Sequence, residues 1–118
     1  MTKNETKCLR EYIAYIPQRL AYLKIFNIKP TNFEWKYYSE LYCEIKKYLK
    51  QHKIFGLYIM RKIGIDKYKA FYGVSERTSY RILAKQRVKF IRFILQKEKK
   101  LFEIYPFKDI KLEELQNG

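Results

Sequence analysis

The scarcity of helix-breaking residues constrains this chain more than any other feature. Only 4 glycines and 3 prolines occur in 118 residues, so few positions interrupt a helix. The apolar residues recur at intervals of three and four, which is the spacing of one face of a helix, and not at the alternate positions of a strand. Hydrophobic residues make up 47% of the chain, enough to build a core. We therefore expect a single all-α domain, residues 1–118, folded as a small helical bundle of about five helices.

The apolar stripes predict where the N-terminal helices lie. A first helix is expected over residues 5–27, with Pro17 inside it as a point of kinking or splitting. A second helix is expected to follow a cap at Thr31 or Asn32 and to run to about Gln51. The residues expected to face the core from these two helices are Leu9, Ile13, Ile16, Leu20, Leu23, Trp35, Tyr38, Leu41, Tyr42, Ile45, Tyr48 and Leu49.

Positive charge is abundant and unevenly distributed. The formal net charge is +14 and the sequence pI is about 9.8. Residues 61–100 hold 13 Lys and Arg against 3 acids, whereas residues 101–118 hold 2 against 4. A balance of this kind attracts polyanions such as DNA, RNA or an anionic membrane surface. No signal peptide is visible and the longest charge-poor stretch, residues 54–60, is too short to span a bilayer, so we expect a cytoplasmic protein.

The sequence lacks the residue sets that catalysis or metal binding requires. His52 is the only histidine, and the two cysteines, Cys8 and Cys43, have no CxxC spacing, so a zinc site would lack ligands. We find no nucleophile with a base, no paired carboxylates and no glycine loop that would cradle phosphates. We therefore expect no catalytic residue, no metal and no cofactor, and we interpret both cysteines as reduced, half-buried helix residues.

The most informative segment covers residues 65–84 and contains the string GVSERTSYRIL. Gly73 is placed to end a short helix in the left-handed conformation, which glycine adopts without a steric penalty. Val74 is expected to pack between this helix and the next one, which Ser75 is placed to cap. The inward face of the second helix is expected to carry Ser79, Ile82 and Leu83.

This segment resembles the helix-turn-helix of bacterial and phage DNA-binding proteins, over about 20 of the 118 residues. The resemblance implies that the second helix meets base edges of double-stranded DNA. Arg77 and Arg81 are then the leading candidates for guanine contacts, with Glu76 accepting from cytosine. Tyr80 would pack on a thymine methyl group or bond to a phosphate. The full set of expected DNA-binding residues is Ser75, Glu76, Arg77, Thr78, Tyr80, Arg81, Lys85, Arg87 and Lys89.

Two further segments are expected beyond this motif. Residues 85–102 are predicted as a basic amphipathic helix, whose core-facing residues would be Val88, Ile91, Ile94, Leu95 and Phe102. Phe90 and Phe93 lie off that stripe, so the helix either braces the motif or also forms a dimer seam. Residues 103–118 are expected as an acidic C-terminal tail, either docked or frayed.

Together these features predict a sequence-specific DNA-binding protein, most simply a small transcriptional regulator of a phage or mobile element. Because one helix reads few base pairs, a homodimer is a possible form. Two alternatives stay open. The 12 tyrosines and many lysines would also suit an RNA or single-strand binder. A phage-type protein that binds a host protein or nucleoprotein complex is the other.

Overall fold

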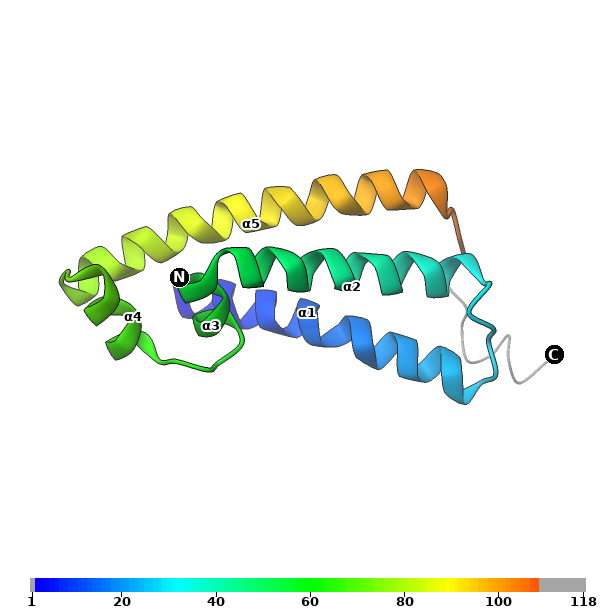
Figure 1. The fold of residues 1–118 in the computed structure, drawn as a ribbon, viewed down its shortest axis with the longest axis horizontal. Helices are drawn as coiled ribbons and strands as arrows, with labels where there is room; N and C mark the ends of the chain where they lie inside the picture. Colours follow the sequence, from blue (N-terminus) through cyan, green and yellow to red (C-terminus); the bar gives the residue numbers. More distant parts are fainter. Residues whose placement is uncertain (1, 109–118) are drawn as a thin grey trace.

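A computed structural model describes residues 2–108, with side chains from residue 5 onward. All regular structure in this part of the chain is helical (Figure 1): α1 (Thr2–Ile25), α2 (Phe33–Gln51), α3 (Lys53–Ile59), α4 (Ile65–Tyr72) and α5 (Glu76–Ile104). The prediction of a small all-α bundle of about five helices is confirmed. Most of the predicted acidic tail lies outside the described residues. The described helices include none with the length and apolar character needed to cross a membrane.

Three long helices form a rod, and two short helices close one of its ends. α2 packs against both α1 and α5, while α3 packs against α2 and α4, and α4 packs against α5. The rod measures 56 × 25 × 22 Å. Figure 1 shows α3, α4, the start of α5 and the N-terminus of α1 gathered at the same end. Segments that are far apart in sequence therefore share one surface there.

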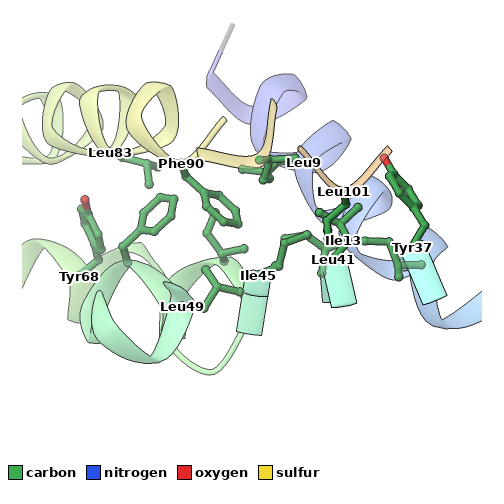
Figure 2. Close-up of a cluster of buried hydrophobic side chains, with 14 residues drawn as sticks. Leu9, Ile13, Tyr37, Leu41, Ile45, Leu49, Tyr68, Leu83, Phe90 and Leu101 are labelled. Atoms are coloured by element: carbon green, nitrogen blue, oxygen red, sulfur yellow. The ribbon is translucent and has the colours of Figure 1, made fainter. Parts of the chain in front are cut away.

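The core runs along the rod as a continuous apolar cluster (Figure 2). Its fully buried members include Leu41 and Ile45 of α2, which lie between the side chains of α1 and α5. Tyr37 is also buried, although the sequence pattern did not place it in the core. Trp35 and Tyr38, which were expected there, are half-buried. The predicted α2 stripe is therefore correct at its centre and rotated by about one residue at its N-terminal end.

The ends of the N-terminal helices follow the expected chemistry. Asn32 caps α2, because its Oδ1 accepts hydrogen bonds from the backbone N–H groups of Glu34 at 2.8 Å and Trp35 at 3.3 Å. α2 ends at Gln51, as predicted. α1 continues through Pro17, so the splitting that the proline suggested does not occur.

Gly56 lies within α3 and is required there by close packing. A Cβ atom built on it would lie 2.1 Å from the carbonyl oxygen of Leu49, which belongs to α2. Backbone thus packs directly on backbone where α2 and α3 meet. The structure places this glycine in the interior of a helix.

The predicted motif helix and the basic helix after it are one uninterrupted helix, α5. Because the helix has no break, the inward position of Ser79 and Leu83 sets which residues face the core further along. Steps of three and four from Leu83 lead to Arg87, Phe90 and Ile94, which are all buried.

The residues expected to face the core from positions 85–102 are therefore mostly exposed. Val88 is 48% exposed, Ile91 40%, Leu95 58% and Phe102 44%, whereas Ile94 is buried as predicted. A helix treated as a separate element has no fixed rotation about its axis. The sequence pattern therefore chose the wrong one of two apolar stripes on α5.

Candidate nucleic-acid interface

A three-residue turn joins α4 to α5. Gly73 adopts φ 62° and ψ 39°, the left-handed conformation expected at this position. Ser75 then takes an extended backbone conformation, and its Oγ accepts a hydrogen bond from the N–H of Thr78 at 3.2 Å. The same hydroxyl donates to Thr78 Oγ1 at 3.0 Å. Both local predictions, the left-handed glycine and the serine cap, are confirmed.

A tyrosine and glutamine network links α4 to α5. Tyr68 is fully buried, and its hydroxyl donates to Gln86 Oε1. Gln86 Nε2 in turn donates to the hydroxyl oxygen of Tyr72 at 2.8 Å. Burial, followed by the neighbouring Tyr72 and Tyr58, raises the pKa of Tyr68 above its usual value. Sequence reasoning missed this network, although the spacing of Tyr68 and Tyr72 by one helical turn was a signal for it.

The inward face of the first turns of α5 agrees with the prediction. Ser79 and Leu83 are completely buried, and Ile82 is half-buried. The Ser79 hydroxyl donates to the backbone carbonyl of Glu76 at 2.6 Å, so this small polar side chain is satisfied without any partner outside its own helix. Leu83 and Tyr68 belong to the same buried cluster (Figure 2), and the burial of Leu83 fixes the rotation of α5 about its axis.

The outward face of α5 carries unpaired positive charge. Arg77, Arg81 and Lys85 are exposed and follow one another at intervals of four, which places them along one strip of the helix. None of the three makes a hydrogen bond or ion pair with the described residues 5–108. Lys89 and Glu76, two further predicted site residues, are also exposed. Arg77, Arg81 and Lys85 are called the basic strip below.

Arg87 does not belong to this surface, which corrects its expected role. Only 4% of the residue is exposed. Its Nη2 forms an ion pair with Glu5 and its Nη1 donates to Thr6 Oγ1 at 3.3 Å, both on α1. In the sequence, Arg87 looks like one more exposed arginine of a basic helix, because its partner Glu5 lies about 80 positions away in the chain.

Tyr80 and Thr78 lie at the margin of the exposed face, not at its centre. Both are half-buried, and Tyr80 packs against the core cluster. Burial raises the pKa of Tyr80, and Tyr58, Glu76 and Asp66 add to this effect. Tyr80 thus remains available to a ligand only along its outer edge.

Within the described part of the chain, no three His, Cys, Asp or Glu side chains gather in a way that would hold a metal ion. Cys8 and Cys43 are free and exposed, whereas half-buried positions were expected.

Comparison with protein-family models, with curated proteins and with solved structures found no match for this chain.

Proposed function

We propose that this protein binds double-stranded DNA sequence-specifically through α4, the turn after it and the first turns of α5, and that it acts as a small transcriptional regulator. The basic strip carries this proposal. Its side chains are exposed, have no partner among the described residues and begin in the first turn of α5. An arginine in this state is free to donate two parallel hydrogen bonds to O6 and N7 of guanine in the major groove.

The position of the basic strip within the fold favours duplex DNA. The strip begins beside the turn at one end of the rod (Figure 1). The rest of the helical bundle extends away from this end. In helix-turn-helix docking, residues near the N-terminus of the second helix reach the base edges while the preceding helix meets the backbone. Lys67 and Lys69 of α4 supply positive charge for that second contact.

The alternative of RNA or single-strand binding has less support. Stacking of unpaired bases needs exposed aromatic faces. All 12 tyrosines lie in the described part of the chain, and Tyr15 is the one among them that is exposed. The remaining tyrosines are buried or half-buried, and the exposed phenylalanines Phe33, Phe71 and Phe102 lie on three different helices. No observation specifically favours binding to a host protein, so this alternative is one outcome of the test of the proposed function.

The proposed regulator pairs as a dimer through an exposed apolar line on α5. Val88, Ile91, Leu95 and Phe102 are spaced by three, four and seven residues, the spacing of a coiled-coil seam. Lys85, Arg92 and Lys99 follow one edge of this line. Two antiparallel helices would bring these basic edges together, whereas two parallel helices would keep them on opposite sides. A parallel pair also points both DNA-binding ends toward one duplex. Because Arg81 stands seven residues before Val88 on the same face, the two helices must diverge before the seam begins, which leaves the arginines free for DNA.

Selection from a random duplex library at about physiological salt tests the proposed function, because non-specific phosphate binding is then weak. We expect an enriched motif. Arg81→Ala should lose about 1–3 kcal/mol of binding free energy at the selected site and relax the preference at one base pair. Lys100→Ala, which removes an exposed cation far along the same helix, should leave the preference for the selected site unchanged. If the library shows no enrichment, sequence-specific binding is rejected, and a host-protein partner becomes the better hypothesis.

Sedimentation equilibrium tests the pairing. Leu95→Lys should shift the protein to monomer while its helical circular dichroism stays unchanged. Ile104→Lys is the matched control, because Ile104 is 53% exposed on the same helix but lies about half a turn away from the apolar line. A wild-type protein that is monomeric both alone and on DNA would overturn the dimer and leave the proposed DNA reading intact.

A further inference from the structure

We infer that a basic pocket beside the candidate interface binds a phosphate group of the DNA backbone. The basic pocket is a cavity of about 600 Å³ whose wall includes Lys7, Arg10, Arg61 and Lys62, with the rings of Tyr58 and Tyr80. The identity of the ligand rests on the proposed function, since the phosphate is taken to belong to the duplex that α5 reads. None of the sequence-predicted site residues except Tyr80 belongs to this pocket.

Arg10 is held in place by the end of α3. Its Nε donates to the carbonyl oxygen of Ile59 at 2.9 Å, and its Nη2 donates to that of Tyr58 at 2.6 Å. The guanidinium also lies over the Tyr58 ring, 5.1 Å from its centroid. Its Nη1 group makes no hydrogen bond within the described residues. A cation fixed in this way loses little conformational entropy when an anion binds.

The pocket gathers positive charge without a matching acid in its wall. Lys7 lies 3.9 Å from Glu11, and both side chains are well exposed, so this ion pair is weak. Asp66 and Glu76 are close enough to influence Tyr80, but neither lines the cavity. Four like charges collected on one surface repel one another, and a bound phosphate relieves that repulsion. The lining therefore favours an anion over a neutral ligand.

Arg61 occupies a backbone conformation that suits glycine better. Its φ is 59°, in the left-handed region that costs L-residues conformational energy. Its N–H bonds to the carbonyl of Tyr58 at 3.1 Å, as part of the turn that ends α3. A charged side chain is thus retained where glycine would be unstrained, as expected if the side chain itself is needed.

Tyr80 connects the basic pocket to the basic strip. It forms part of the pocket wall and stands on α5 between Arg77 and Arg81 in sequence. Figure 1 shows that the N-terminus of α1 and the segment after α3 lie at the same end of the rod as the start of α5. A DNA strand whose sugar-phosphate backbone passes Tyr80 as it leaves the major groove would meet Lys7 and Lys62. Phosphate contacts of this kind fix the register of a protein on DNA without reading its sequence.

The double variant Lys7→Gln/Lys62→Gln tests the pocket, because both lysines are exposed and neither holds the fold together. Its control is Lys24→Gln/Lys29→Gln, which removes the same charge from exposed positions at the other end of α1. Affinity is measured for the selected duplex and for a scrambled duplex, at salt concentrations from about 50 to 200 mM.

Loss of one phosphate contact should reduce the slope of log K against log salt by about 0.9, which is about an eightfold loss of affinity at 0.1 M salt. We expect this change for both duplexes with the pocket variant and not with the control. Equal slopes for the two variants would overturn the pocket, even if wild-type protein distinguishes the duplexes. If wild type does not distinguish them but the slope still changes, the pocket stands and sequence-specific reading fails.

Arg61→Gly separates binding from stability. The glycine relieves the left-handed conformation, so the melting temperature should rise while affinity for both duplexes falls. Asn27→Gly is the control, because Asn27 has a φ of 61° at the opposite end of the rod. It should leave affinity unchanged. A purely structural role for Arg61 is indicated if Arg61→Gly binds both duplexes as tightly as wild type, and that result would remove Arg61 from the pocket.

Discussion

Replacing Gly56 by alanine sets two opposing effects against each other. Alanine favours a helix over glycine by about 1 kcal/mol, so the substitution would stabilise an exposed helix. At Gly56 the new Cβ would lie 2.1 Å from the carbonyl oxygen of Leu49 and 2.9 Å from its carbonyl carbon. Because both atoms belong to the backbone, no side-chain rotation relieves the overlap. α3 must move away from α2 by more than about 1 Å to restore ordinary van der Waals contact.

This movement would draw Phe55 and Ile59 from the core, where they are 2% and 1% exposed. Overpacking of this kind costs about 1–3 kcal/mol, and a backbone neighbour places Gly56 at the upper end of that range. After subtracting the gain in helix propensity, we expect Gly56→Ala to lower the free energy of unfolding by about 2 kcal/mol. Urea unfolding followed by circular dichroism measures this difference.

Two other glycines serve as controls. A Cβ at Gly64 meets no atom within 4 Å, so Gly64→Ala should change stability by less than about 1 kcal/mol. Gly73 also has open space around it, but its φ of 62° makes alanine strained, and we expect a loss of about 1 kcal/mol. The expected order of destabilisation is therefore Gly56, Gly73 and Gly64. A Gly56→Ala protein as stable as wild type would refute the close backbone packing of α2 on α3.

Two further predictions concern charge and protonation. Glu5→Gln removes the counter-ion of the buried Arg87 and should lower the free energy of unfolding by about 1–2 kcal/mol, whereas the exposed Glu11→Gln should change it little. Thermal unfolding of both variants checks this, and equal losses would contradict it. Burial, with a contribution from Glu98, raises the pKa of Tyr37 from 10.0 to about 12. A raised tyrosine pKa stabilises the fold below pH 10, and that stability is lost as pH rises through the folded pKa. The free energy of unfolding should therefore fall between about pH 10 and 12, and less steeply in Tyr37→Phe; identical profiles would show that Tyr37 does not contribute.

The features that were predictable from sequence are those set by neighbouring residues. Asn32 and Ser75 cap helices because a short polar side chain reaches backbone N–H groups two or three residues ahead. Gly73 takes a left-handed conformation for a similarly local reason. The all-α class followed from spacing along the whole chain. None of these conclusions requires knowledge of what packs against the helix.

The features that were missed depend on contacts between distant segments. Arg87 is buried because α1 supplies Glu5 and Thr6, and no residue near position 87 in the sequence indicates those partners. The rotation of α5 depends on its continuity with the helix start, where Leu83 is buried in the core cluster. Once α5 is recognised as one helix, the choice between its two apolar stripes follows from helical geometry alone.

Because α5 is one uninterrupted helix, a tilt at one of its ends displaces residues at the other. Its 29 residues span about 43 Å. Near its C-terminal end, Phe102 and Phe107 clamp it against Tyr37, with ring centroids 6.1 Å and 5.0 Å from that of Tyr37. Arg77 lies about 37 Å along the helix from Phe102, so a tilt of about 5° at this clamp would displace it by about 3 Å, roughly the length of a hydrogen bond. The aromatic clamp therefore helps to position an arginine at the opposite end of the molecule, together with the buried residues of α5 that lie closer to it, such as Ser79 and Leu83.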